Sequence, residues 1–276
     1  MREMTKLLVL CSFAKVSKYS PVFSGTGGEK GPCMSILSRF IDIIYPARCH
    51  ICRSFMSNDE RPNNHFCPDC LNGFSKISPP LCPICGIPFE SLSEENHLCE
   101  DCLRKRPFFD GLGAPYLYEG GIMDAIHQMK YAGKTYLADS LGSLLASFAT
   151  KWLDNSERLL MMPVPLHPKK LTERGFNQSL LLARTMMPIL STELDFLSLR
   201  RVIYTRSQTG LNSDERKRNV RRAFAIDGQR ELEGKTVILV DDVATTGNTM
   251  NECARVLKKA GAEKVFCLAL ARTAGY

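Results

Sequence analysis

Four Cys-x-x-Cys pairs lie within the first 102 residues of the 276-residue chain, and they constrain its fold more than any other feature. Two residues between cysteines form a tight turn that directs both sulfur atoms at one metal ion, and a second pair completes a tetrahedral site. Fourteen residues separate the first pair from the second, and thirteen separate the third from the fourth. The spacing predicts two consecutive structural Zn²⁺ sites, with the ligands Cys49, Cys52, Cys67 and Cys70, and Cys82, Cys85, Cys99 and Cys102.

Other uses of paired cysteines fit less well. A disulfide framework belongs to secreted proteins, and a redox Cys-x-x-Cys motif normally occurs once in a chain. His50, His65 and His97 lie near the pairs and could replace a sulfur, although the cysteines already supply four ligands per site. Cys253 and Cys267 stand in helix-like and strand-like patterns, and we expect them to be buried as small apolar side chains. Because zinc thiolates need reducing conditions, we expect a cytoplasmic protein.

Length and composition bound the domain organisation. At roughly 150 residues per domain, the chain should hold just under two domains. Hydrophobic residues make up 44% and charged residues 24%, which is a globular composition. No apolar run reaches the ~20 residues of a membrane helix. We expect a disordered extension over 1–33, a double zinc ribbon with a leading amphipathic helix over 34–106, and an α/β domain over 107–276.

From about residue 112 the hydrophobic pattern alternates between strands and helices. Strands are expected at 112–118, 159–164, 236–240 and 265–271, and helices at 122–131, 136–152, 178–190 and 248–260. Strands that alternate with helices favour a mostly parallel sheet with helices on both faces. Ligands of such sheets bind beyond the carboxyl ends of the strands.

One of these strand ends carries the residues with the clearest chemistry, in the sequence VILVDDVATTGNT at 237–249. Four apolar residues are followed by Asp241 and Asp242, and then by a small, hydroxyl-rich loop at the start of a helix. Backbone N–H groups and the helix dipole make such a loop an anion cradle. Two adjacent acids suit a sugar diol or a hydrated Mg²⁺. The segment therefore predicts a phosphorylated sugar as ligand.

Two other interpretations of this segment remain. A Walker-B strand of a P-loop NTPase also joins a hydrophobic run to an Asp, but it requires Gly-x-x-x-x-Gly-Lys-Ser/Thr elsewhere. Both Gly-Lys-Thr triplets, at 133–135 and 234–236, have Gln where the first glycine belongs. The other interpretation is an ordinary strand–turn–helix whose acids have no function. It does not explain why the residues at 237–249 all suit the binding of one ligand.

Residues 237–249 resemble the motif of type I phosphoribosyltransferases that binds 5-phosphoribosyl 1-diphosphate (PRPP). The whole arrangement, from about residue 34 to 273, resembles the ComF family, which includes GntX-like proteins. Three further segments carry the resemblance: Tyr118-Glu119-Gly120 with Lys130-Tyr131; Pro163-Val164-Pro165 with Arg174-Gly175-Phe176-Asn177-Gln178; and Gln208-Thr209-Gly210-Leu211 with Arg216, Asn219-Val220 and Ala223-Phe224. The resemblance implies a double zinc ribbon followed by a type I phosphoribosyltransferase-like domain with a mostly parallel sheet.

The resemblance also implies roles for single residues. Asp241 and Asp242 would hold the ribose hydroxyls and act in catalysis with Arg174, and Mg²⁺ would accompany PRPP. The PRPP-binding set is Asp241, Asp242, Ala244, Thr245, Thr246, Gly247, Asn248 and Thr249. The candidates for diphosphate binding and for the flexible loop at 204–222 are Lys130, Arg174, Arg216 and Asn219. Closure of that loop would exclude water.

Much of the positive charge lies in the same region. The chain carries a formal +7, and residues 200–222 hold eight Lys and Arg against two acidic residues, a local net charge of +6. Such a run fits a solvated face, a diphosphate site or contact with a nucleic-acid backbone. The resemblance implies a phosphoribosyltransferase of unknown acceptor that serves DNA uptake, natural competence or nucleotide metabolism. The alternative is a non-catalytic competence factor that binds single-stranded DNA and uses PRPP or a nucleotide as regulator.

Overall fold

The computed structural model describes residues 46–56, 65–89, 95–153, 159–204, 222–227 and 232–274. All of them belong to one compact unit, Pro46–Tyr276. The expected extension over 1–33, the amphipathic helix that follows it and most of the loop at 204–222, including Arg216 and Asn219, lie outside the described residues. The domain boundaries stay predictions. No helix in the described part of the chain has the length and hydropathy to cross a membrane.

A parallel sheet forms the centre of the described structure. Its strands are β1 (Gly111–Gly113), β2 (Tyr116–Leu117), β3 (Leu159–Pro163), β4 (Glu193–Leu194), β7 (Thr236–Ala244) and β8 (Lys264–Arg272). The order is β1-β8-β7-β3-β4, with β2 also beside β8, and every pair is parallel. A separate antiparallel pair is formed by β5 (Leu199–Arg201) and β6 (Phe224–Ile226).

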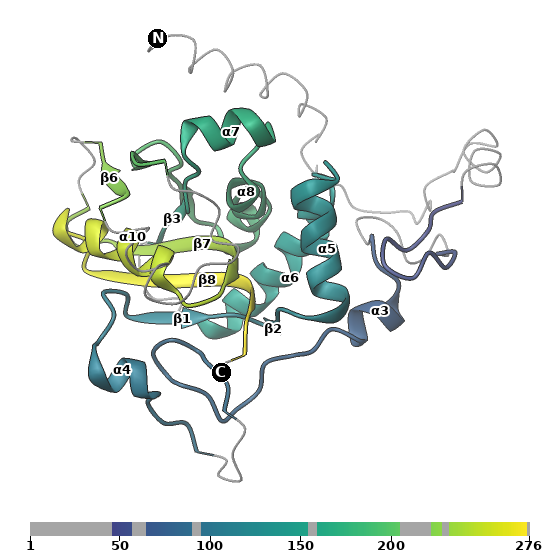
Figure 1. Cartoon of the computed structure of the whole chain (residues 1–276), viewed down its shortest axis with the longest axis horizontal. Coiled ribbons are helices and arrows are strands. Elements are labelled where there is room, and N and C mark those ends of the chain that lie inside the picture. The colour runs from purple at the N-terminus through teal and green to yellow at the C-terminus, as the bar shows by residue number, and fades with distance from the viewer. Residues whose placement is uncertain are drawn as a thin grey trace, which may run out of the picture. The chain divides into compact units, whose positions relative to one another are not determined.

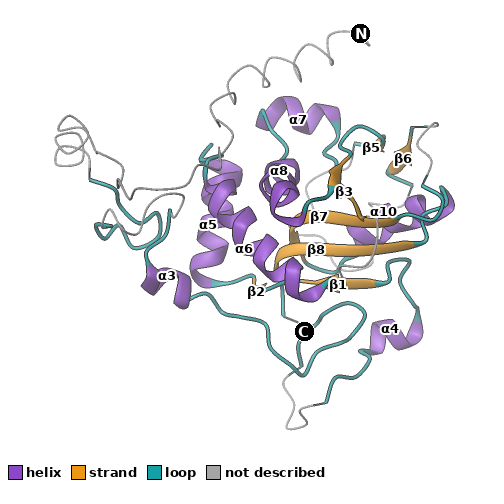
Figure 2. Cartoon of the chain, turned by 180° about the vertical axis from the view of Figure 1, so that it is seen from behind, coloured by secondary structure: helices purple, strands orange, loops and turns teal. Residues whose placement is uncertain are grey.

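Helices cover both faces of this sheet, which confirms the predicted α/β class. The helices are α3 (Pro68–Asn72), α4 (Glu100–Arg104), α5 (Gly120–Tyr131), α6 (Leu137–Trp152), α7 (Pro168–Arg174), α8 (Gln178–Leu190) and α10 (Asn248–Lys259). Helix α10 lies in front of the sheet in Figure 1, and α6 and α8 lie against the opposite face in Figure 2. Ile238 and Val240 of β7 join the core under α6 and α8, whereas Val237 and Leu239 join the core under α10.

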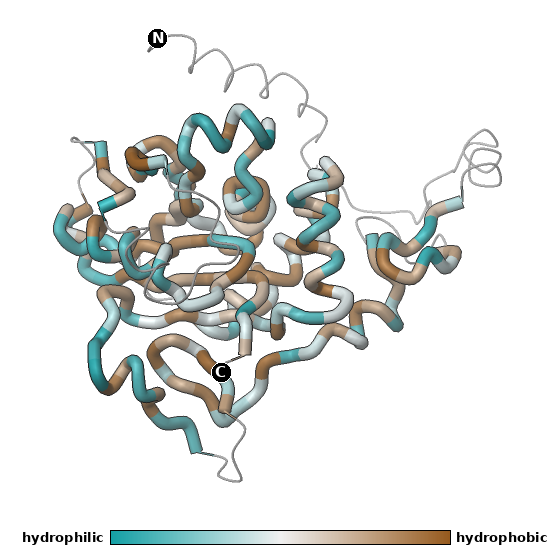
Figure 3. Tube along the Cα trace, viewed as in Figure 1, coloured by the Kyte–Doolittle hydropathy of each residue, from teal (hydrophilic) through white to brown (hydrophobic). Residues whose placement is uncertain are grey.

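The central strands are apolar because both of their faces are buried. Figure 3 shows hydrophobic residues along much of β7 and β8. Cys253 and Cys267 are buried in the core under α10, as predicted. Leu182 and Met186 of α8 are fully buried in the other core, so the apolar stripe of this helix serves packing.

The structure corrects two strand predictions. The strand predicted at 112–118 is two short strands, β1 and β2, that are separated at Ala114 and Pro115; a proline cannot donate a ladder hydrogen bond. The strand predicted to end at Val240 continues to Ala244, because β8 runs beside it to Arg272. The two acids therefore belong to the end of the strand rather than to the loop that follows.

Each zinc ribbon packs into a different core. The first ribbon (residues 46–56 and 65–76) contributes Phe66 and Phe74 to the core that contains α5, α6 and α8. The second ribbon (residues 81–89 and 95–105) contributes Cys82 and Ile84 to the core under α10. The two ribbons are therefore attached to opposite sides of the sheet.

Candidate functional site

The eight predicted zinc ligands form two groups of four. Within each group the Sγ atoms all lie within 4.8 Å of one another. The Cys52–Cys67 and Cys85–Cys99 sulfur separations are both 3.6 Å. Four sulfurs at about 2.3 Å from a tetrahedral Zn²⁺ lie about 3.8 Å apart, whereas a disulfide bond is about 2.05 Å long. Both groups thus have the ligands and spacing of a zinc ribbon.

Hydrogen bonds favour the thiolate form, which binds zinc, at Cys52 of the first group and Cys82 of the second. Bonds from Ser54 lower the pKa of Cys52 to about 6. Burial acts to raise the pKa of Cys82, but backbone N–H groups of Cys85 and Cys99 outweigh it, and the pKa is lowered to about 7. Burial raises the pKa of Cys70 in the first group and of Cys85 and Cys102 in the second. Each group therefore combines thiols that ionise readily with thiols that Zn²⁺ itself would have to deprotonate.

The nearby histidines make other contacts. The Nδ1 atom of His65 lies 2.8 Å from the Ser140 hydroxyl of α6. The ring of His97 stacks on Phe89 with their centroids 3.9 Å apart. His50 accepts a hydrogen bond at its backbone oxygen from the side chain of Gln128, over 2.9 Å. These histidines attach or brace the ribbons, and the sulfur groups consist of cysteine alone.

A pocket of about 380 Å³ lies where β3 and β7 end. It brings together most of the site residues predicted from the sequence: Lys130, Arg174, Asp241, Asp242, Ala244, Thr245, Thr246, Gly247, Asn248 and Thr249. Arg216 and Asn219 fall outside the described residues. The position of the pocket agrees with the rule that parallel sheets bind ligands beyond the carboxyl ends of their strands.

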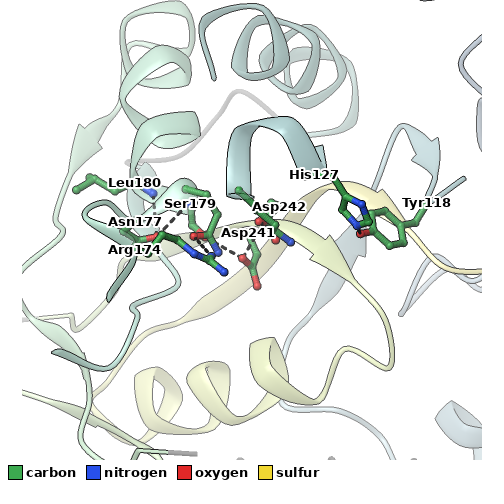
Figure 4. Close-up of polar contacts among 10 residues, drawn as sticks. Tyr118, His127, Arg174, Asn177, Ser179, Leu180, Asp241 and Asp242 are labelled. Atoms are coloured by element: carbon green, nitrogen blue, oxygen red, sulfur yellow. Dashed lines mark hydrogen bonds and ion pairs between the residues drawn. The ribbon is translucent and has the colours of Figure 1, made fainter. Parts of the chain in front are cut away.

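The two acids have different partners, as Figure 4 shows in part. Asp241 accepts hydrogen bonds at Oδ1 from the Ser179 hydroxyl (2.8 Å) and from the backbone N–H of Asp242 (2.9 Å). Asp242 forms an ion pair through Oδ2 with Lys130 Nζ, at 2.8 Å. Burial, followed by the negative charge of Asp242, raises the pKa of Asp241 to about 7. Burial also opposes the charge of Lys130, but its ion pair with Asp242 outweighs this and raises the Lys130 pKa.

The loop after β7 is shaped as an anion cradle. Gly247 has φ of 70°, a left-handed conformation that glycine adopts at little cost, and it is the N-cap of α10. The backbone N–H of Asn248 lies 3.5 Å from Thr246 Oγ1. The first N–H groups of a helix lack partners within the helix, and the helix dipole adds positive charge there. Loop and helix together therefore suit a phosphate group.

Four basic side chains also line the pocket: Lys130, Lys170, Arg174 and Arg201. Burial, together with the charges of Arg174, Arg201 and Lys130, lowers the pKa of Lys170. Like charges that converge in a partly buried site repel one another unless an anion compensates them. Lys130 is compensated by Asp242, so Lys170, Arg174 and Arg201 are the basic side chains of the pocket that suit an anionic ligand.

The segment Arg174-Gly175-Phe176-Asn177-Gln178 is the turn between α7 and α8. Gly175, with φ of 84°, ends α7 in a left-handed conformation. The Asn177 side chain accepts from the backbone N–H groups of Ser179 and Leu180, and its Nδ2 donates to the Val164 carbonyl after β3. The turn thereby places Arg174 on one side of the pocket and Ser179 against Asp241.

Sequence reasoning missed several pocket residues. Ser179 directly follows the Asn-Gln pair at the start of α8. Lys170 lies two residues after Pro168, the first residue of α7. Arg201 was recognised only as part of a basic run. Tyr118 lines the pocket and its hydroxyl lies 2.7 Å from His127 Nε2. A helix start next to a strand end was the available signal for Ser179 and Lys170.

Two models of protein families match the chain, one in its N-terminal part and one in its C-terminal part. Residues 40–103 match the double zinc ribbon domain. Residues 177–275 match the phosphoribosyl transferase domain. The two matches agree with the four-cysteine groups and with the pocket at the end of the parallel sheet.

Whole-chain relatives share this arrangement. DNA utilization protein YhgH of Escherichia coli (strain K12) is 31% identical over 236 residues, which cover 83% of this chain and 98% of the relative. Competence protein F of Haemophilus influenzae is 30% identical over 234 residues, which cover 82% and 96%. Competence protein ComFC of Bacillus subtilis is 25% identical over 245 residues, which cover 83% and 97%. The chain therefore belongs to the ComF family, in which a double zinc ribbon precedes a phosphoribosyltransferase-like domain.

Proposed function

We propose that this protein binds PRPP together with Mg²⁺ in the pocket and acts as a phosphoribosyltransferase. One observation carries the proposal: a carboxyl pair, an anion cradle and four basic side chains line the same pocket. PRPP presents a diol, a phosphate and a diphosphate, so that each part of the ligand has a matching group. A volume of about 380 Å³ is within the usual range for small-molecule sites.

The 5′-phosphate is expected to lie on residues 244–249. Backbone N–H groups at the start of α10 and the hydroxyls of Thr245, Thr246 and Thr249 would donate to its oxygens. The ribose hydroxyls would donate to the carboxylates of Asp241 and Asp242. Ser179 holds Asp241 and Lys130 holds Asp242, so both acids are oriented before a ligand arrives.

The diphosphate is expected to lie against Lys170, Arg174 and Arg201. Displacement at C1 breaks the bond to the diphosphate oxygen, which leaves with the electron pair while the acceptor forms the new bond. Positive charge develops on the sugar ring, and the neighbouring carboxylates stabilise it. Carboxylate and phosphate oxygens are ligands that Mg²⁺ accepts, and the ion would neutralise the departing diphosphate.

Calorimetric titration of PRPP with Mg²⁺ into the zinc-loaded protein tests this proposal. Loss of a charge-assisted hydrogen bond is worth about 1.5–3 kcal/mol, so Asp241→Asn is expected to weaken binding roughly 10- to 100-fold. Asp124→Asn is a suitable control, since Asp124 is exposed on α5 and does not line the pocket. The control should bind as the wild type does.

The proposal fails if the wild-type protein takes up no PRPP at millimolar concentration. It also fails if Asp241→Asn and Asp124→Asn weaken binding equally, because the site would then lie elsewhere. Release of diphosphate when candidate acceptors are added would distinguish turnover from binding alone.

We also propose that the protein works in DNA uptake or use, in a reducing compartment such as the cytoplasm. Relatives are named for DNA utilization and for competence, and the basic run at 200–222 offers charge for a phosphate backbone. Zinc thiolates favour the reducing compartment. In this role single-stranded DNA would bind at the basic run, with PRPP or a nucleotide as substrate or regulator.

Fluorescence anisotropy with a labelled single-stranded oligonucleotide, measured over a range of salt concentrations, tests the DNA role. Lys217→Gln with Arg218→Gln should reduce the salt slope by about 1.4, since each lost phosphate contact contributes about 0.7. Lys151→Gln with Lys259→Gln removes two exposed charges elsewhere and should leave the slope unchanged. Binding that does not respond to salt would contradict this interpretation.

A further inference from the structure

Arg272 is a buried cation at the end of β8. The residue is only 3% exposed. Its Nη2 lies 3.7 Å from the Sγ atom of Cys85 in the second zinc group. Its Nε and Nη1 atoms are buried without a hydrogen-bond partner among the described residues. A buried guanidinium with unmet donors is costly unless a negative charge lies close by.

The second zinc group can supply that charge. Four thiolates around one Zn²⁺ carry a net charge of about −2. The ligand set and sulfur spacing of Cys82, Cys85, Cys99 and Cys102 fit the ion. A metal-loaded group is therefore an anion placed directly against Arg272. Beside the first group, Lys134 makes a different contact: its Nζ lies 3.5 Å from His50 Nδ1.

The backbone of Arg272 is joined to the start of the phosphate loop. Arg272 is aligned with Ala244, the last residue of β7. The next residue, Thr273, donates from its backbone N–H to the Ala244 carbonyl (3.1 Å) and from its hydroxyl to the Thr245 carbonyl (3.3 Å). The sheet and two hydrogen bonds thus connect the backbone at Arg272 to the start of the loop.

The second ribbon supports the loop from a further side. The backbone N–H of Leu112 in β1 donates to the carbonyl of Ile84, which lies between two zinc ligands, over 2.8 Å. Leu112 also lies beside Gly247. The backbone N–H of Phe108 donates to the side chain of Asn251 on α10, over 2.6 Å. The ribbon therefore contacts β1, whose Leu112 lies beside Gly247, and the segment that follows the ribbon contacts α10.

We propose that Arg272 is a positioning residue whose counter-ion is the zinc–thiolate group of the second ribbon. Through Arg272, metal at this site holds residues 244–249 in the conformation that receives a phosphate. This proposal depends on the proposed function in one respect only, namely that the phosphate bound by the loop belongs to PRPP. The coupling of metal, Arg272 and loop can be measured without PRPP.

The test compares full-length, zinc-loaded wild type with Arg272→Gln, Arg272→Lys and the control Lys134→Gln. Native mass spectrometry during titration with a chelator follows each zinc ion, and hydrogen–deuterium exchange follows the peptide that covers 244–250. Loss of a residue that supports a metal site typically lowers metal affinity about 10- to 100-fold. Arg272→Gln should release one zinc at correspondingly lower chelator concentration and exchange faster at 244–250.

The charge of Arg272 predicts the order of the variants. Arg272→Lys keeps a positive charge and should recover part of both properties, which mere packing of a long side chain would not explain. Lys134→Gln should match the wild type at 244–250. Arg272→Gln that keeps both zinc ions as firmly as the wild type would overturn the proposal. Loss of the second zinc without faster exchange at 244–250 would overturn it as well.

A wild-type experiment covers the case in which Arg272→Gln does not fold. Limiting chelator removes part of the zinc, and alkylation followed by peptide mapping identifies the group that has become reactive. Molecules that have lost zinc from the second group should exchange faster at 244–250 than molecules that have lost it from the first. Equal exchange at 244–250 in both populations would overturn the proposal.

Discussion

The two zinc ribbons have similar ligand spacing but contact different parts of the protein. The first is attached to helices: Gln128 of α5 donates to the carbonyl of His50, and Ser140 of α6 contacts both the backbone N–H and the ring of His65. The first ribbon also contacts the edge of the sheet at β2, where the Leu117 N–H donates to the Ser75 carbonyl. The second contacts β1 through Ile84 and β8 through Arg272.

Because of this difference, the two ribbons lie near different parts of the pocket lining. Helix α5 carries Lys130, which pairs with Asp242, so the first ribbon supports the wall that holds the acids. The second ribbon supports residues 244–249, the proposed cradle of the 5′-phosphate. Loss of zinc from the two groups should therefore disturb different parts of the same site.

Replacement of one zinc ligand in each ribbon is expected to have the largest effect. Structural zinc sites contribute about 10–16 kcal/mol of apparent binding energy to folding. Cys70→Ser and Cys102→Ser should each leave one zinc per chain, measured by native mass spectrometry. Exchange should rise over α5 in the first variant and over 244–250 in the second. The same regions losing protection in both variants would break the comparison.

Lys130→Met tests the wall beside the first ribbon. It leaves the carboxylate of Asp242, whose side chain is 5% exposed, without its partner. Removal of one member of a buried pair costs about 3–5 kcal/mol of the free energy of unfolding. Denaturant titration should show this loss, and adding Asp242→Asn should recover part of it. A double variant with strictly additive losses would show that the pair is not coupled.

Gly86→Ala tests the join between the second ribbon and β1. Gly86 has φ of 66°, and an added Cβ would lie 2.4 Å from the carbonyl oxygen of Leu112. Strain at positive φ costs about 1–2 kcal/mol and overpacking about 1–3 kcal/mol. Gly133→Ala is the matched control, since Gly133 has φ of 65° but nothing within 4 Å of the added atom. Equal loss of stability in Gly86→Ala and Gly133→Ala would contradict a close contact between Gly86 and Leu112.

The pH dependence of PRPP binding should be smaller and should report on Asp241. Its carboxyl has a pKa of about 7, and a ribose hydroxyl is accepted best by the ionised form. Affinity should rise about tenfold from pH 6 to pH 8. In Asp241→Asn only PRPP itself still titrates. The difference between the wild-type and variant pH profiles therefore gives the contribution of Asp241 to binding. Identical profiles would remove Asp241 from the binding site.

The same pKa has a consequence for the ligand-free protein. Because the folded-state pKa of Asp241 lies above the ordinary value of 3.8, the native protein binds more protons than the unfolded chain between these two values. The contribution of Asp241 to stability is therefore fully present below about pH 4 and declines as pH rises toward 7. Asp241→Asn should be less sensitive to pH over this range.

The parts of the site that are local in sequence could be predicted from it. The spacing of cysteines within each pair fixes how two sulfurs can meet, and the eight predicted ligands come together in two groups of four. The segment at 237–249 joins an apolar strand to acids and a glycine-containing turn, so its place at a strand end followed directly. Within this segment the predicted end of β7 was wrong, because β8 extends the pairing to Ala244.

Contacts between distant segments could not be predicted. Arg272 and Cys85 are 187 positions apart, and nothing near either residue announces the other. Lys170 and Arg201 reach the pocket from α7 and from β5, two elements that lie outside the main sheet and that only the tertiary fold brings to the end of β7. Ser179 meets Asp241 because β3 and β7 are neighbours and Asn177, the N-cap of α8, donates to the Val164 carbonyl just after β3. These contacts depend on topology rather than on local pattern.

Hydrogen–deuterium exchange of the zinc-loaded protein, with and without PRPP and Mg²⁺, tests the central claim most directly. We predict that PRPP slows exchange at 244–250, where the 5′-phosphate would bind. It should also slow exchange at 165–179, the segment that carries Lys170 and Arg174, where the diphosphate would bind. Diphosphate alone should protect 165–179 and leave 244–250 unchanged. If saturating PRPP with Mg²⁺ leaves exchange at 244–250 unchanged, the pocket does not hold PRPP as proposed.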